Sequence, residues 1–227
     1  MWSPLVSCVI PAFNAEAFLA EAIDSAIQQT HSVTEIIVVD DGSTDATAAI
    51  IEGYGDRVRG LRQENAGPAA AINAGIRIAQ GELVAFLDAD DVWIPEKLAR
   101  QLIRFEAQPT IDITWGDAQN FWDGEAPELA ARLKDRITHP FPAPGLTMLA
   151  RRRVFDLVGP FNAERAHSFA AEWLLLAREH GVVVDHVESV LVRRRLHGAN
   201  RSRELAAKSR EEFLHLMKDH LDRRRGR

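Results

Sequence analysis

Two apolar stretches of the chain run straight into groups of acidic residues. The stretch Ile36–Val39 is followed by Asp-Asp-Gly, and the stretch Leu83–Leu87 by Asp-Ala-Asp-Asp. Short runs that are apolar at every position are typical of strands buried on both faces, which occur in parallel sheets covered by helices. These two stretches therefore favour an α/β fold built around a largely buried sheet.

Helical patterns alternate with such strands through the first hundred residues. We expect a strand at Leu5–Phe13, a helix at Ala15–Gln29, another strand at Val58–Gln63 and another helix at Pro68–Ala79. Segments that alternate in this way form a mostly parallel central sheet with helices on both faces. The sequence thus predicts a Rossmann-like α/β fold.

The pattern is less regular after residue 106. Ser168–Gly181 has strong helical spacing, and Val182–Gly198 is typical of a long strand. The other expected elements are a helix at Pro95–Glu106, a strand and turn at 111–124, a Pro-rich loop at 140–146, a helix starting within 147–159 and an amphipathic helix from Glu204 onward. A second, more variable half of the molecule therefore begins near residue 106.

Charge is unevenly distributed along the chain. Its 227 residues are 46% hydrophobic, enough for a substantial core, and carry a net charge of −6. The segment Arg193–Arg227 holds 12 Lys and Arg against 5 Asp and Glu, or +7, which leaves −13 for residues 1–192. Such a basic end is typical of a solvated terminal helix, or of a patch that contacts phosphate or an anionic membrane surface.

No apolar run approaches the ~20 residues that a membrane-spanning helix requires. The N-terminus has no basic leader and runs directly into a strand. We therefore expect a cytoplasmic protein, with a peripheral position at the inner membrane face as the alternative that the basic end allows. The single cysteine, Cys8, lies inside the first expected strand and is expected to be a small buried hydrophobe.

Polar clusters follow three of the expected strands. They occupy residues 11–14, 40–43 and 88–91. Ligands of parallel α/β sheets bind beyond the carboxyl ends of the strands, so these clusters are expected to share one edge and to form the binding site.

The third cluster predicts a metal site. On an extended segment, residues two apart point the same way, so Asp88 and Asp90 share a face and repel each other. A divalent cation of the Mg²⁺ or Mn²⁺ type would relieve this repulsion and would also meet the phosphates of a substrate. The alternative is a helix cap at Asp90 or Asp91 ahead of Pro95, with the other carboxylates hydrated, and we favour Asp91 as a cap.

Four stretches follow one another in a fixed order: SCVIPAFNAEAFLAEAIDSAIQQT, EIIVVDDGSTDAT, QENAGPAAAINAGIRIAQGELVAFLDADDVWIPEKL and VFDLVGPFN. In this order they resemble the family 2 glycosyltransferases with the GT-A fold. The resemblance covers Ser7 to Ser202 and is strongest through Leu98. It implies an inverting, hexosyltransferase-like transfer of a sugar from a nucleoside diphosphate donor, expected to be a UDP-sugar, to a hydroxyl acceptor, with Mn²⁺ or Mg²⁺ as the cofactor.

The resemblance also implies roles for residues at the strand ends. Asp88-Ala89-Asp90 corresponds to the family's DXD motif, in which Asp88 meets the ribose and Asp90 the metal. The residues that border the nucleoside and its base are Pro11, Phe13, Asn14 and Asp41. Without the resemblance, these residues have simpler explanations. Phe13 can equally be a core residue. The stretch DDGSTD can be only a turn that leads into a helix with its N-cap at Ser43, Thr44 or Asp45.

The second half is expected to supply the general base. The resemblance points to Glu172, at the start of the helix within 168–181, although family members often carry an acidic pair there. An acid in a first helical turn can also be present only because it favours the helix macrodipole. A second departure from the family is Ile72, where an arginine is common, so a phosphate contact is either lost or supplied by Arg77 or by the late arginines.

The late arginines lie in the stretch RRRLHG. If this stretch is extended, Arg193, Arg195 and His197 share one face. The resemblance implies that His197 is a metal ligand and that Arg193 or Arg195 binds the diphosphate. The alternative is an ordinary surface histidine beside solvated arginines.

Together these inferences divide the chain into three parts. Residues 1–105 form a nucleotide-sugar-binding half, residues 106–203 an acceptor-binding and catalytic half of the same GT-A domain, and residues 204–227 a basic helical tail. We expect no nucleic-acid partner, and we expect peripheral membrane contact, if any, through the tail. The rival function is a non-catalytic nucleotide-sugar-binding protein of the same fold that has lost its general base.

Overall fold

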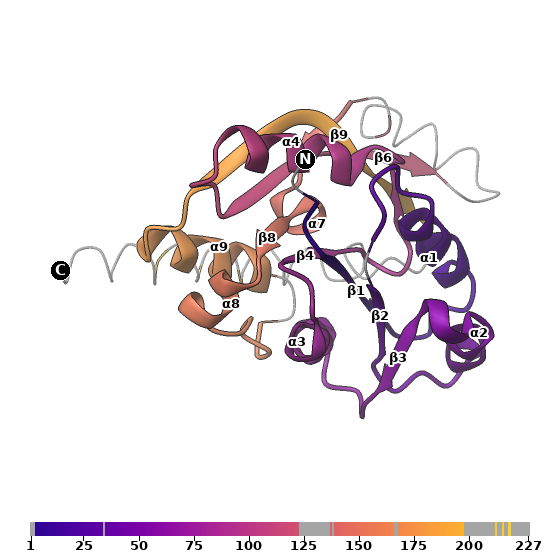
Figure 1. Ribbon diagram of the computed structural model, residues 1–227. Coiled ribbons are helices and arrows are strands. Elements are labelled where there is room, and N and C mark those ends of the chain that lie inside the picture. The colour runs from indigo at the N-terminus through magenta and orange to yellow at the C-terminus, as the bar shows by residue number, and fades with distance from the viewer. Residues whose placement is uncertain are drawn as a thin grey trace.

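The structure is a computed structural model, which describes residues 3–33, 35–122, 137, 139–165, 168–197, 212, 215 and 218. Within these residues, strands form one nine-stranded sheet in the order β3-β2-β1-β4-β8-β6-β9-β5, with β7 paired to β6. Helices lie on both sides of the sheet (Figure 1). The expected α/β fold with a mostly parallel sheet is confirmed.

The first half is a parallel sheet with a helix after each of its first three strands. Pairing is parallel between β1 and β2, between β1 and β4 and between β2 and β3. In chain order its elements are β1 (Val6–Ala12), α1 (Leu19–Ile27), β2 (Glu35–Asp40), α2 (Thr47–Gly53), the 3₁₀ turn Gly55–Arg57, β3 (Arg59–Arg62), α3 (Pro68–Ile78) and β4 (Leu83–Phe86).

The second half extends this sheet with antiparallel and parallel pairs. Strand β8 joins β4 antiparallel, and the long strands β6 and β9 pair in parallel. Its elements are β5 (Val92–Trp93), α4 (Lys97–Ala107), β6 (Ile113–Trp122), β7 (Phe141–Pro142), α7 (Pro144–Thr147), β8 (Leu149–Arg151), α8 (Arg153–Val158), α9 (Phe169–Glu179) and β9 (Val184–Leu196).

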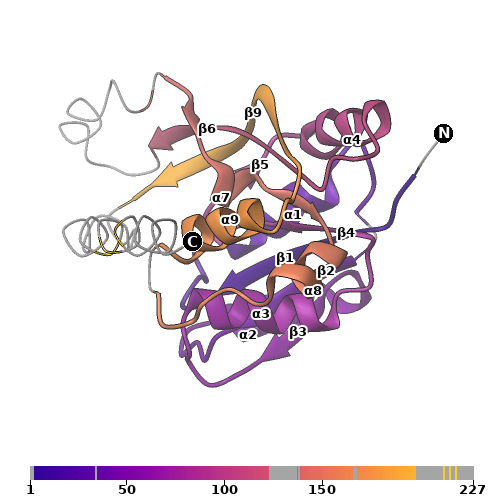
Figure 2. The ribbon, with the colours of Figure 1, turned by 90° about the vertical axis from the view of Figure 1, so that its left-hand side faces the viewer.

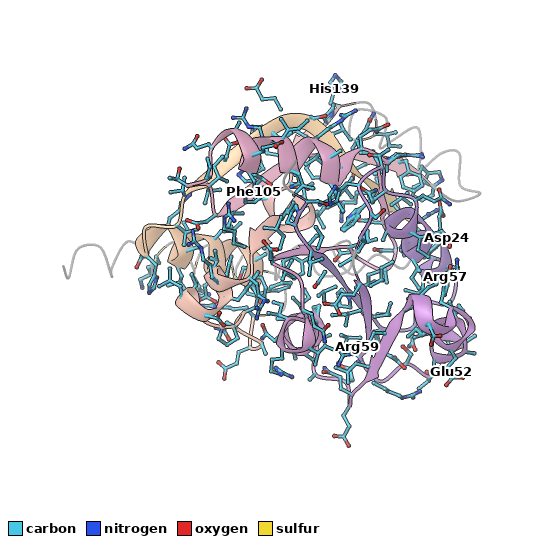
Figure 3. The ribbon with its side chains drawn as sticks, viewed as in Figure 1. Asp24, Glu52, Arg57, Arg59, Phe105 and His139 are labelled. Atoms are coloured by element: carbon cyan, nitrogen blue, oxygen red, sulfur yellow. The ribbon has the colours of Figure 1, made fainter. Side chains whose placement is uncertain are left out.

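The two faces of the sheet form separate apolar cores because side chains alternate along each strand. Cys8 and Ile10 of β1 pack with α1, α2 and α4, while Val9 packs with α3, α8 and α9. Phe105 of α4, labelled in Figure 3, is 1% exposed and belongs to the first core. The charged side chains labelled around α1, α2 and β3 in Figure 3 are exposed: Asp24, Glu52, Arg57 and Arg59.

The carboxyl ends of the strands meet along one edge, as predicted. In Figure 2 this edge is at the left, where β6 and β9 end, and the N-terminus is at the right. Backbone bonds join the loops that follow the strands: Asp41 N donates to Ala12 O at 2.8 Å, and Gln63 N donates to Asp40 O at 2.9 Å. The loops after β1, β2 and β3 are therefore tied to one another at this edge.

Several local predictions were wrong. Helix α2 begins at Thr47 with Ala46 at its N-cap, although Asp45 Oδ1 does accept the Thr47 N–H at 3.0 Å. The expected Pro-rich loop at 140–146 contains β7 and most of α7, and β8 precedes the helix expected within 147–159. Helix α4 has Glu96 at its N-cap, so Asp91 does not cap it.

The expected basic tail at 204–227 lies outside the described residues, except for the helical residues Glu212, His215 and Lys218. The division of the chain near residue 106 remains a prediction. Strands β6, β8 and β9 continue the sheet of the first half, so the sheet itself marks no boundary there. Over the part of the chain that the structure describes, the helices are too short or too polar to span a membrane.

Candidate functional site

Three carboxylates converge after β4. One ligand oxygen from each of Asp88, Asp90 and Asp91 lies within 4.8 Å of the other two. The segment is a turn rather than an extended strand, since Asp91 N donates to Asp88 O at 3.1 Å. The turn adds Asp91 to the pair that the sequence predicted, so the cluster carries one more acid than expected.

Asp91 is the buried member of this carboxylate cluster. It is 3% exposed, and its Oδ1 accepts the backbone N–H of Arg195 at 2.9 Å. Burial, and then the charges of Asp88 and Asp90, raise the pKa of Asp91 well above its usual range. A positive charge placed among the three oxygens would have the opposite effect on this pKa.

His197 lies beside the carboxylate cluster. Its Nε2 is 3.1 Å from Asp90 Oδ2, and its ring centroid is 4.6 Å from that of Phe18. Its side chain is 12% exposed. His197, which directly follows β9, is therefore held against the turn that follows β4.

Arg193 and Arg195 both approach Phe121, which confirms that they share one side of β9. Their guanidinium carbons lie 4.5 and 4.6 Å from the Phe121 ring centroid. Arg193 is exposed and is paired in register with Val92, the residue that follows Asp91 in the sequence. Arg195 is buried, donates from Nε to Asp90 O at 2.9 Å and forms an ion pair with Glu21.

The first strand end presents an aromatic side chain beside a tightly bonded loop. Phe13 is 47% exposed. Asn14 has a φ of +48°, a region that asparagine tolerates better than most residues. Its N–H donates to Ser43 Oγ at 2.9 Å and its Oδ1 accepts the Thr44 N–H at 2.9 Å. Asn14 thus fixes the loop after β1 to the loop after β2.

Asp41 is 3% exposed and orders the loop that precedes α3. Its Oδ1 accepts Gln63 Nε2 at 2.7 Å and Ala66 N at 2.9 Å, and its Oδ2 accepts Gly67 N at 2.8 Å. Gly67 has a φ of +86°, which glycine adopts without strain. The carboxylate therefore shapes the loop between β3 and α3 around the strand end.

Glu172 occupies the first turn of α9 and is 8% exposed. Its Oε2 accepts Asn162 Nδ2 at 3.2 Å, and its Oε1 lies 3.6 Å from Arg165 Nη2. Asn162 follows Phe161, whose ring centroid is 5.8 Å from that of Phe86 at the end of β4. An aromatic contact therefore connects the surroundings of Glu172 to the strand that leads into the carboxylate cluster.

Ile72, which stands where an arginine is common in the family, places an apolar side chain in the core. Ile72 is 6% exposed and packs in the cluster on the α3 face. Arg77 is exposed in the last turn of α3, which begins at Pro68 next to the strand-end loops. Because Arg77 stands about nine residues and roughly 14 Å along the helix from this beginning, it is poorly placed to replace a contact there.

The carboxylate cluster has the chemistry of a site for Mg²⁺ or Mn²⁺. Both ions prefer carboxylate oxygens, and both keep positions for water and for substrate phosphates. Three acids approach one another closely here, and burial together with the charges of Asp88 and Asp90 raises the pKa of Asp91, as repulsion within such a cluster would. The residues that would hold such an ion are Asp88, Asp90 and Asp91, with His197 next to Asp90.

Some residues of the site were missed in the sequence. Glu21 falls within the helix expected at Ala15–Gln29 without any sign of a role in the site, yet it pairs with Arg195. Asn162 and Arg165, the partners of Glu172, lie in an irregular segment without a distinctive pattern. The signal that could have identified Asp91 is its place in an Asp-x-Asp-Asp turn directly after a buried strand.

The family model for glycosyl transferase family 2 matches residues 7–155. The chain therefore belongs to this family. It is 32% identical to the uncharacterized glycosyltransferase RP339 of Rickettsia prowazekii in an alignment 212 residues long that covers 88% of this chain and 66% of that protein. It is also 32% identical to the uncharacterized glycosyltransferase alr2836 of Nostoc in an alignment 224 residues long that covers 91% of this chain and 69% of that protein. The chain thus spans about two thirds of the length of these relatives.

Solved structures share the fold. The crystal structure of S. aureus TarS 1–349 matches with a TM-score of 0.72 at 20% sequence identity, over 95% of this chain and 64% of that one. The complete TarS structure matches with the same TM-score and identity, over 95% of this chain and 39% of that one. The fold is that of the GT-A glycosyltransferases.

Proposed function

We propose that this chain transfers a sugar from a nucleoside diphosphate sugar to a hydroxyl acceptor, with inversion at the anomeric carbon and with the help of a divalent cation. The observation that carries the proposal is the carboxylate cluster at the carboxyl edge of the sheet, with His197 beside Asp90. TarS 1–349 has been solved in complex with UDP and with UDP-GlcNAc, which supports a UDP-sugar as the donor.

The nucleoside would lie across the ends of β1, β2 and β4. Phe13 offers an exposed ring on which a base can stack. Asp41, expected to meet the base, is buried and bonded through both oxygens to the loop before α3, so we assign it to shaping the loop around the base. Asp88 is exposed and can accept a ribose hydroxyl. Pro11 and Asn14 complete the border of this site, Asn14 mainly by fixing the loops on either side.

The diphosphate would lie next to the carboxylate cluster. When bound there by Asp90 and its neighbours, Mg²⁺ or Mn²⁺ supplies Lewis acidity toward the charge that develops on the departing diphosphate. Arg193, exposed and next to β5, can donate to a phosphate oxygen. Arg195, by contrast, is committed to Glu21 and Asp90 O, so we assign it to fixing the turn.

Glu172 is our candidate general base. The acceptor oxygen would form a bond to the anomeric carbon while the bond from that carbon to the diphosphate breaks, and the nucleoside diphosphate would leave with the electron pair. The hydroxyl proton would pass to the Glu172 carboxylate. Asn162 and Arg165 hold this carboxylate in one orientation, which is a requirement for a base.

The rival function is nucleotide-sugar binding without turnover, and the Arg165–Glu172 ion pair favours it because Arg165 would compete with the acceptor hydroxyl for the Glu172 carboxylate. Incubation of the chain with UDP-sugars, Mn²⁺ and simple hydroxyl acceptors would distinguish the two by the release of UDP. Metal-dependent release that Glu172→Gln abolishes supports the transferase. Tight UDP-sugar binding without release across a broad panel of donors and acceptors would refute it.

We further propose that the protein has no nucleic-acid partner and that it acts in the cytoplasm. The C-terminal end, basic when counted from Arg193, is a candidate for contact with an anionic membrane surface, where a lipid-linked acceptor would be found; residues 204–227 supply 7 of its 12 Lys and Arg. Sedimentation with anionic vesicles, with and without residues 204–227, tests this contact. Equal sedimentation of the two chains would exclude it.

A further inference from the structure

A carboxylate from the tail binds the N-cap residue of the helix that carries Glu172. Glu212 Oε2 accepts the backbone N–H of Ser168 at 3.1 Å and the Ser168 hydroxyl at 3.0 Å. Ser168 is the N-cap residue of α9 and is 5% exposed. The two partners are 44 residues apart, so this contact joins the tail to the catalytic half of the domain.

The contact replaces the cap that Ser168 would ordinarily provide. An N-cap serine usually accepts a backbone N–H of its own helix through its side chain, but α9 has no side-chain cap bond of this kind. The Ser168 hydroxyl instead donates to Glu212. A carboxylate at a helix N-terminus is also favoured by the macrodipole, so Glu212 supplies both an acceptor and a suitable charge.

The backbone of Glu172 is bonded to Ser168 as well. Its backbone N–H donates to Ser168 O at 2.9 Å, the bond that closes the first turn of α9. Its side chain is held from the other direction by Asn162 and Arg165. The direction of the Glu172 carboxylate therefore depends on Ser168, and the position of Ser168 depends on Glu212.

We propose that Glu212 is a positioning residue for Glu172: by binding Ser168, it holds the first turn of α9 in the orientation that proton transfer from the acceptor requires. This inference rests on the proposed function, since it assigns Glu212 to the same reaction. The tail then contributes, through Glu212, to the position of the candidate general base in the catalytic half.

The test uses the full chain with Glu212→Ala, Glu212→Gln and, as a matched control, Lys218→Gln. Lys218 is a helical and exposed residue of the same tail. Glu212→Ala is expected to lower kcat about tenfold, a typical cost of a slightly misplaced catalytic group, with the donor KM within about twofold of wild type. Glu212→Gln keeps an acceptor oxygen and should retain most of the activity, and Lys218→Gln should match wild type.

Amide hydrogen exchange gives a second readout that does not require turnover. Exchange at the first turn of α9 should be faster in Glu212→Ala than in wild type. Ser168→Ala removes the hydroxyl bond to Glu212 but keeps the backbone N–H bond, so it should lower kcat by less than Glu212→Ala does. Normal kcat in Glu212→Ala, or an equal fall in kcat in Lys218→Gln, would overturn the positioning role alone. A wild-type chain that binds UDP-sugars without turnover would overturn the proposed function, and the positioning role with it.

Discussion

Lys97 is a fully buried amine at the start of α4, and we expect it to make the stability of the fold depend on pH. Its Nζ donates to Gln101 Oε1 at 2.7 Å and lies 4.4 Å from the centroid of the Trp93 ring. The titratable group that acts on it is the Cys8 thiol of β1, whose pKa burial raises to about 12, so Cys8 is neutral near pH 7. Burial accordingly lowers the pKa of Lys97 from 10.5 to about 7.

The size and sign of the effect follow from this difference. A pKa that is about 3.5 units lower in the folded state corresponds to roughly 5 kcal/mol of lost stability when both states are protonated. Between about pH 7 and about pH 10.5 the unfolded chain holds a proton that the folded chain has released, so stability rises by about 1.4 kcal/mol per pH unit. The penalty is therefore complete below pH 7 and disappears above pH 10.5.

The perturbation is Lys97→Met, which keeps the length of the side chain and removes the amine. At about pH 7 the variant should be more stable than wild type by roughly 2–4 kcal/mol, because the gain is offset in part by an unpaired Gln101 Oε1. The gap should shrink by about 2 kcal/mol between about pH 7 and about pH 9. Comparison of the two proteins cancels the other groups that titrate in this range.

Urea unfolding followed by tryptophan fluorescence at several pH values measures this gap. Lys218→Met serves as the control, since Lys218 is exposed and its substitution should leave the difference from wild type independent of pH. A Lys97→Met gap that stays constant with pH would refute the reasoning, as would a variant less stable than wild type at about pH 7.

Three further substitutions test the site. Glu172→Gln should lower kcat by about 10²–10⁴-fold with UDP affinity unchanged, which steady-state kinetics and calorimetry would measure, and an unaltered kcat would exclude it as the base. Phe13→Ala should weaken UDP binding by roughly 1–3 kcal/mol without changing the urea midpoint, because the ring is exposed; unchanged UDP affinity would remove it from the nucleoside site. Asp41→Asn should destabilise the protein by about 1–3 kcal/mol in urea, since an amide nitrogen would face a backbone N–H, and unchanged stability would show that the loop does not depend on this carboxylate.

The parts of the fold that local pattern determines were predictable from the sequence. The apolar runs around Ile36–Val39 and Leu83–Leu87 correspond to β2 and β4, and the acids that follow them do meet at one edge. Strands β5 and β8 were not predictable, because they have two and three residues and are defined by their pairing, β5 with β9 and β8 with β4 and β6. Such short strands carry no periodic signal of their own.

The same distinction applies to the candidate site. His197 next to Asp90 was expected from the resemblance to the family, and the structure brings the two together. The place of Asp91 was not expected, because it depends on the backbone N–H of Arg195, 104 residues away, and on a turn rather than an extended segment. The contact of Glu212 with Ser168 is likewise long-range, and charge counting along the tail gave no sign of it.

Calorimetric titration of UDP tests whether the carboxylate cluster is the diphosphate site. We expect UDP to bind the wild-type chain in Mn²⁺ and to lose most of its affinity in EDTA, because the diphosphate would then face three carboxylates without a cation between them. In Asp90→Asn the difference between Mn²⁺ and EDTA should largely disappear. Equal UDP affinity in Mn²⁺ and in EDTA for the wild-type chain would contradict the assignment of this cluster to a metal-bound diphosphate.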